Sequence, residues 1–194
     1  MNSDSSSFSP EIFLNPLRRS TQVICDAGEI KELIMPAFEK TTGEDFPEDI
    51  AISVLSEQDI SQSAALYGFA WNPSIRGFAI NKEQGKKHRI YAVSDELDKL
   101  MLVLGHEIGH VLSDSLKDKR DEEAKAYAFS LAWMKAIREH NIGGLKNSFM
   151  ADPPAQNGIH DIALDFVLDK IRKGTKAIAL FFDLCFGRVS VVAD

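Results

Sequence analysis

The chain has few cysteines, no long apolar run and no excess of basic residues. Its two cysteines, Cys25 and Cys185, are far apart, and neither belongs to a Cys-x-x-Cys pair, so we expect neither a disulfide framework nor a cysteine metal site. No stretch approaches the ~18 uninterrupted apolar residues of a membrane span. The first ten residues lack the basic and apolar regions of a secretory signal. These absences favour a cytoplasmic protein without a membrane partner.

The charge balance also excludes some partners. The formal net charge is −7, from 22 Lys and Arg against 29 Asp and Glu, which argues against nucleic acid as the main partner. The length of 194 residues and the 44% hydrophobic content are sufficient for one domain with a core. We expect a flexible, serine-rich arm over residues 1–20, the main domain over 21–145, and a helical extension over 146–194 that packs on the core.

One short motif, GHEIGH at positions 105–110, points to a specific chemistry. Residues four apart lie on one face of a helix, so His106 and His110 project side by side and can share one Zn²⁺ at roughly 2.0–2.1 Å each. Glu107 is one step round the helix, where a general base for water activated by a metal should lie. The competing interpretation is an amphipathic helix with two surface histidines.

The surroundings of the motif favour the metal site over that competing interpretation. Apolar residues at helical spacing predict a helix over 95–112 with a buried stripe, and the histidines lie on the margin of this stripe. Gly105 and Gly109 are also four apart, and each costs a helix about 1 kcal/mol relative to alanine. A pair of glycines on one side of the helix predicts that another backbone passes close to it.

The segments before the motif predict strands, and those after it predict helices. We expect a helix over 28–42 that stops at Gly43, a strand over 50–56, and a hairpin of strands 77–80 and 88–93. Residues 57–73 are ambiguous, and either Ser94 or Asp95 is expected to cap the motif helix. This order predicts an α+β fold with a small antiparallel sheet packed on helices. An extended peptide could add to the edge of such a sheet beside the metal cleft.

A second helix is predicted from Asp121 to about His140. The acidic cluster at its start suits the helix dipole, but one of its carboxylates could also be the third metal ligand. In the C-terminal tail, from residue 152 onward, the sequence pattern predicts a helix from about 157 to 172, an apolar segment over 177–186 and a strand over 188–192. We expect this tail to pack on the core, and the alternatives are a partner surface or a segment that covers the cleft.

Together, the HEIGH helix, the preceding hairpin and the EAKAYA run at 123–128 resemble the gluzincin metallopeptidases. The chain is most similar to the compact ImmA/IrrE-type peptidases and the minigluzincins, over about residues 77–131. The resemblance implies a zincin-like fold, with His106, His110 and Glu123 as zinc ligands and Glu107 as general base. Glu122 and Asp121 are the fallback ligands. The chain lacks the metzincin continuation after His110 and shows no helix-turn-helix module.

The resemblance implies a zinc-dependent endopeptidase that acts on a protein or peptide substrate. A further donor should stabilise the oxyanion, and His160 and Tyr91 are candidates for this role. The alternative function is a non-catalytic or latent regulatory or binding protein on the same scaffold, in which the C-terminal segment occupies the cleft.

Overall fold

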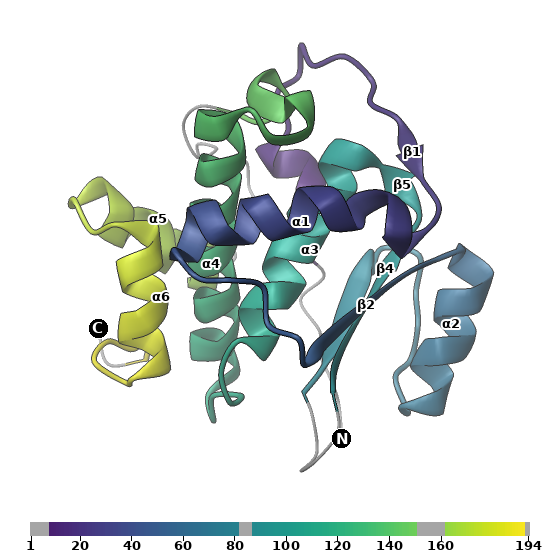
Figure 1. The fold of residues 1–194 in the computed structure, drawn as a ribbon. Helices are drawn as coiled ribbons and strands as arrows, with labels where there is room; N and C mark the ends of the chain where they lie inside the picture. Colours follow the sequence, from purple (N-terminus) through teal and green to yellow (C-terminus); the bar gives the residue numbers. More distant parts are fainter. Residues whose placement is uncertain (1–7, 82–86, 151–161, 193–194) are drawn as a thin grey trace.

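A computed structural model describes residues 8–81, 87–150 and 162–192, and it has an α+β fold (Figure 1). The strands are β1 (Val23–Ile24), β2 (Ile50–Leu55), β3 (Gly77–Ile80), β4 (His88–Val93) and β5 (Asp95–Glu96). The helices are α1 (Ala27–Thr42), α2 (Glu57–Leu66), α3 (Leu97–Val111), α4 (Lys119–His140), α5 (Ile162–Arg172) and α6 (Ala177–Cys185), with short 3₁₀ helices at Pro10–Phe13 and Ile142–Asn147. The predicted helix over 28–42, its stop at Gly43 and the hairpin strands are confirmed.

The main sheet has three strands in the order β2-β4-β3, and it is mixed rather than antiparallel. Strands β3 and β4 form the predicted antiparallel hairpin, but β2 pairs with β4 in parallel. The reason lies in the ambiguous segment, which forms helix α2 and carries the chain back across the sheet. Strand β3 then lies on the far edge and runs opposite to β2, and the hairpin brings β4 between them, parallel to β2.

The sheet lies between helix α2 on one side and the other helices on the opposite side (Figure 1). Alternate residues of β4 face opposite sides, so Ile90 and Ala92 are fully buried in the core shared with α3, whereas Tyr91 lies toward α2. Beyond α3, helix α4 packs against α3, α1, α5 and α6. Helix α4 is therefore the central helix of the fold, and its first turns lie beside the motif helix.

The N-terminus of α3 is capped differently from our prediction. The helix begins at Leu97, and its N-cap residue Glu96 makes no side-chain cap. Instead, Gln22 O accepts a hydrogen bond from Leu97 N at 2.8 Å, and Thr21 Oγ1 accepts one from Asp98 N at 3.3 Å. A distant segment of the chain thus supplies the acceptors that a local cap normally offers. The prediction of Ser94 or Asp95 as the cap is wrong.

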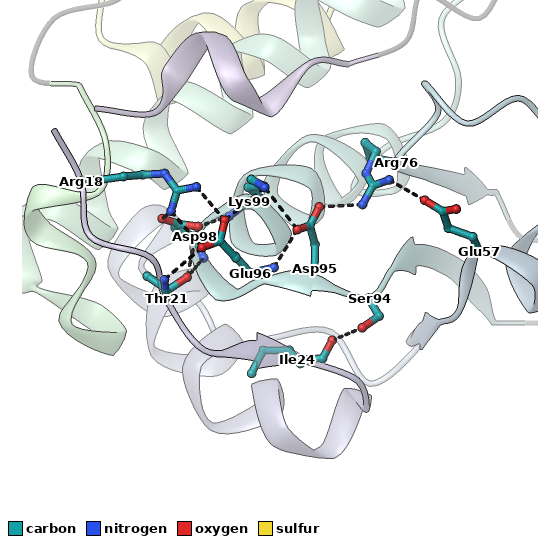
Figure 2. A network of polar contacts seen from close by, with 10 residues as sticks. All are labelled: Arg18, Thr21, Ile24, Glu57, Arg76, Ser94, Asp95, Glu96, Asp98 and Lys99. Atoms are coloured by element: carbon teal, nitrogen blue, oxygen red, sulfur yellow. Dashed lines mark hydrogen bonds and ion pairs between the residues drawn. The ribbon is translucent and has the colours of Figure 1, made fainter. Parts of the chain in front are cut away.

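Ion pairs reinforce this junction between the N-terminal segment and α3 (Figure 2). Arg18 donates to Glu96 at 2.7 Å and to the fully buried Asp98 at 2.6 Å. Ser94, one of the predicted caps, donates to Ile24 O at 2.7 Å and so holds β1 instead. The motif helix is therefore anchored at its start by residues 18–24.

Both motif glycines allow close packing of α3 on α4. A Cβ atom on Gly109 would lie 2.9 Å from the Cα of Ala126, so the prediction that a second backbone passes close is confirmed there. A Cβ atom on Gly105 would instead lie 2.5 Å from the Cδ1 atom of the Trp133 indole. The Trp133 Nε1 donates to Met101 O at 2.8 Å, and this hydrogen bond holds the indole against α3.

The ends of the described chain pack on this core. Residues 1–7 lie outside the described residues. Phe8, Phe13 and Leu14 are buried, so the described part of the predicted arm packs on the core. Leu180, Phe181 and Leu184 of α6 are also part of the core. The predicted strand over 188–192 is absent from the described segment, and Ser190 and Val191 donate to Asp121 there. No helix in the described ranges is long and apolar enough to cross a membrane.

Candidate metal centre

Three side chains from two helices converge at the junction of α3 and α4. His106 and His110 come from successive turns of α3, and Glu123 comes from the first turns of α4. The Nε2 of His106 lies 3.5 Å from Glu123 Oε2, and the Nε2 of His110 lies 4.0 Å from Glu123 Oε1. One potential ligand atom from each residue lies within 4.8 Å of the others, so this group could hold a metal ion.

The spacing and chemistry of this group fit a small divalent cation. Ligand atoms placed tetrahedrally at about 2.0–2.1 Å from one ion are roughly 3.3–3.4 Å apart. The observed separations, 3.5 Å to one oxygen of Glu123 and 4.0 Å to the other, are longer than this, so the group would have to close around an ion. Two imidazoles with one carboxylate form the ligand set of open sites in which a fourth position stays available.

Glu107 lies beside this group and is almost completely buried. Its side chain is 6% exposed and lines the same cleft as the two histidines. Burial, opposed by the charge of His110 and reinforced by that of Glu123, raises the pKa of the Glu107 carboxyl to about 7. A carboxyl group in such surroundings can exchange a proton near neutral pH.

Glu122 makes a contact that orients His110. Its Oε1 lies 2.8 Å from His110 Nδ1, and its Oε2 accepts a hydrogen bond from Leu116 N at 2.7 Å. Burial raises the pKa of Glu122, but the contacts with His110, Lys125 and Leu116 outweigh it, and the net pKa is lowered. An ionised carboxylate only accepts, so His110 Nδ1 donates this hydrogen bond, and the other ring nitrogen, Nε2, faces Glu123.

The three acidic residues at the start of α4 therefore have three different environments. Glu123 faces both histidines, and Glu122 contacts the Nδ1 side of the His110 ring. Asp121 accepts hydrogen bonds from Ser190 Oγ at 2.9 Å and Val191 N at 2.6 Å. Of the two fallback ligands, neither Glu122 nor Asp121 belongs to the convergent group in the described structure.

A cleft of about 250 Å³ opens over the three convergent residues. Aromatic side chains form much of its wall, including Phe69, Trp71 and Phe78. Phe8 also lines it, and its ring stacks on His106 with the centroids 4.3 Å apart and the planes 18° from parallel. The cleft is thus largely apolar, with the ionisable groups gathered on its floor.

Strand β3 forms one side of the cleft and is an edge strand of the described sheet. Val93 N donates to Arg76 O at 2.9 Å, so the hydrogen-bonded pairs of the β3–β4 ladder fall at every second residue from Arg76. The peptide groups of Gly77 and Ala79 therefore face away from β4, toward the open edge. Both residues line the cleft.

The two predicted oxyanion stabilisers are not placed in this cleft by the structure. Tyr91 lies on the sheet face toward α2, where its hydroxyl is 3.2 Å from that of Tyr67 and its ring stacks on Phe78. It is absent from the described residues that line the cleft. His160 lies outside the described residues.

Sequence reasoning missed two residues that contribute to the site, Phe8 and Lys125. Phe8 comes from the N-terminal segment, about a hundred positions before the histidine on which it stacks, and no local pattern connects the two. Lys125 is 0% exposed and bonds to Glu122. Its place in an alanine-rich run at 124–128 was the available signal, because lysine is rarely fully buried without a partner.

Comparison with known proteins gives no neighbour, since no family model, curated protein or solved structure matches this chain.

Proposed function

We propose that this chain is a zinc-dependent endopeptidase with a zincin-like fold. One observation carries the proposal, namely the convergence of His106, His110 and Glu123 beside a buried Glu107 on the floor of a cleft. A structural metal site would need the three ligands but would have no use for a buried acid that can exchange protons. The resemblance of the HEIGH and EAKAYA segments to gluzincins supports the same reading.

Zinc suits the mixture of imidazole and carboxylate donors, and when bound it would polarise a peptide carbonyl and acidify water. His106 and His110 would hold it through Nε2, and Glu123 through its carboxylate. The hydrogen bond from His110 Nδ1 to Glu122 keeps that imidazole in the required tautomer.

In this proposal Glu107 takes the proton of the attacking water and later delivers it to the leaving amine. In the metal-free chain, burial raises the pKa of this carboxyl to about 7, so it can exchange a proton near neutral pH. A cation at the three ligands would lower this pKa by direct attraction, which favours the proton-accepting form at the start of the reaction.

The substrate in this proposal is an extended peptide that pairs with β3. The outward peptide groups of Gly77 and Ala79 offer it backbone hydrogen bonds, as in other cases of strand addition. The apolar wall formed by Phe69, Trp71 and Phe78 would receive its side chains. Backbone pairing holds the chain across the floor of the cleft, where Glu107 lies.

The second candidate is a latent or non-catalytic protein on the same scaffold. The stacking of Phe8 on His106 favours it, because a segment from the N-terminal side already fills part of the cleft. In contrast, none of the described residues of α5 or α6 lines the cleft, so the described structure gives no support for a C-terminal plug.

One experiment tests the proposal with three proteins purified without chelator, namely wild type, Glu107→Gln and Glu123→Gln. We expect one zinc per wild-type chain by elemental analysis, and cleavage of a library of unstructured peptides by mass spectrometry. Glu107→Gln should keep the zinc and lose roughly 10²–10⁴-fold in rate, because it removes the proton acceptor. Glu123→Gln should lose most of the zinc, because it removes a ligand.

The outcomes separate the two candidates. Wild type that holds zinc without cleaving any peptide would favour the latent or non-catalytic protein. Folded wild type that refuses added zinc, or Glu107→Gln that cleaves as fast as wild type, would refute the proposed mechanism.

A further inference from the structure

A fully buried lysine lies directly behind the candidate metal centre. Lys125 on α4 is 0% exposed, and its ammonium lies 3.0 Å from Glu122 Oε1. It also donates to Ser113 Oγ at 3.1 Å and to His110 O at 3.2 Å. A fourth contact, to Asp114 O, is longer at 3.5 Å, so the three shorter contacts account for the three donors of the ammonium group.

A buried ammonium is unfavourable unless it is paired and fully hydrogen-bonded. An apolar side chain of similar length would fill the same space without this desolvation cost, and such replacements are often neutral or stabilising. Packing alone therefore does not account for a lysine here. Its partners suggest a different role, because two of the three bonds lead to His110.

The first connection to His110 passes through Glu122. The Oε1 of Glu122 is shared between Lys125 at 3.0 Å and His110 Nδ1 at 2.8 Å. The ammonium neutralises the carboxylate and fixes its position along α4, where Lys125 follows Glu122 by three residues. Glu122 can then remain an ionised acceptor for the Nδ1 proton although it is largely buried.

The second connection is made through the backbone. His110 lies in the last turn of α3, where carbonyl groups lack partners within the helix. Lys125 donates to that carbonyl, so one ammonium holds both the backbone of His110 and the carboxylate that orients its ring. Ser113, just after α3, is held by the same group.

We propose that Lys125 is a positioning residue that acts through Glu122 to hold His110 in the tautomer and orientation needed to bind a metal through Nε2. The metal-binding part of this inference rests on the proposed function. The orientation of His110 is a property of the metal-free chain, and it can be measured independently of any metal.

The experiment compares wild type with Lys125→Met, Glu122→Gln and the double variant. Lys135→Met is the matched control, because Lys135 is exposed on the same helix and pairs with the exposed Glu139 at 3.7 Å. Two readouts are used, the ¹⁵N chemical shifts of the His110 imidazole in metal-free protein and the affinity for Zn²⁺ in competition with a chelator.

We expect wild type and Lys135→Met to show a single His110 tautomer with the proton on Nδ1. Lys125→Met and Glu122→Gln should show a mixture of tautomers, and each should bind Zn²⁺ about 10–100-fold more weakly, as for other losses of an orienting partner. The loss in the double variant should be smaller than the sum of the two single losses, because Lys125 acts on the His110 ring through Glu122.

Several outcomes would overturn the inference. These are a wild-type tautomer and affinity in Lys125→Met, or losses that add in the double variant. If Lys125→Met does not fold, the double variant, which buries no charge, gives the comparison with Glu122→Gln. A further loss in it as large as that of Glu122→Gln itself also refutes the inference. Wild type that binds no Zn²⁺ but loses its single tautomer in Lys125→Met would refute the proposed function and leave the positioning role intact.

Discussion

The contact between Gly109 and α4 allows a sharp test of how helix packing determines the site. A Cβ atom on Gly109 would meet Ala126 Cα at 2.9 Å, Phe129 Cβ at 3.0 Å and Ala126 O at 3.1 Å. Two of these three atoms belong to the backbone of α4 and cannot rotate away. Gly109→Ala should therefore push α3 and α4 apart by a few tenths of an ångström.

The effect on stability is the balance of two opposing contributions. Alanine favours an isolated helix over glycine by about 1 kcal/mol. Overpacking against a fixed neighbour costs about 1–3 kcal/mol. We therefore expect a net loss of about 1 kcal/mol in the free energy of unfolding, small enough for the variant to fold.

The effect on metal binding should be larger, because the ligands come from both helices. Glu123 lies on α4 one turn before Ala126, whereas His106 and His110 lie on α3. Metal–ligand distances tolerate only about 0.2 Å of error. Separation of the helices at Gly109 should therefore weaken Zn²⁺ binding at least about tenfold, a change of 1.4 kcal/mol.

Urea unfolding of the metal-free protein and Zn²⁺ competition titrations measure the two effects separately. Lys135→Ala serves as the control on the exposed face of α4. If Gly109→Ala gains the full helix-propensity stabilisation and binds Zn²⁺ as tightly as wild type, the close approach of the two helices does not control the site, and the reasoning is wrong.

Two further predictions concern regions away from the cleft. Contacts with Arg18 and then Lys99 lower the pKa of Glu96 to about 2, so its contribution to stability is present above about pH 4.5 and is lost as the pH falls toward 2. After solvent screening, we expect this contribution to the free energy of unfolding to be about 1 kcal/mol. Urea unfolding should therefore show Glu96→Gln to be less stable than wild type at pH 6 and nearly as stable at pH 2. An equal difference at both pH values would refute this prediction. Phe181 is 3% exposed and packs edge-on against Phe129 at 5.3 Å, so Phe181→Ala should cost about 3–5 kcal/mol. If the proposed function holds, the fraction that stays folded should bind zinc and hydrolyse peptides as wild type does, whereas a gain in hydrolysis would indicate that α6 restrains the site.

Local sequence determined those features that depend on neighbours along the chain. The spacing of four between His106 and His110 places them on one face of any helix that contains them. Gly43 ends α1 because it adopts a left-handed conformation, with φ 82°, that most residues avoid. The strands at 77–80 and 88–93 follow from their apolar runs and the polar connection between them. These features were predictable because each results from interactions within a few residues.

Tertiary structure decided the features that depend on contacts between distant segments. Among Asp121, Glu122 and Glu123, only the packing of α4 on α3 determines which carboxylate faces the histidines, because a small rotation of α4 would exchange their places. The cap of α3 comes from Thr21 and Gln22, and no pattern near residue 97 could show it. The sequence by itself thus determined which residues could do the chemistry. Helix packing decided which of them meet, because side-chain direction round a helix changes by about 100° per residue.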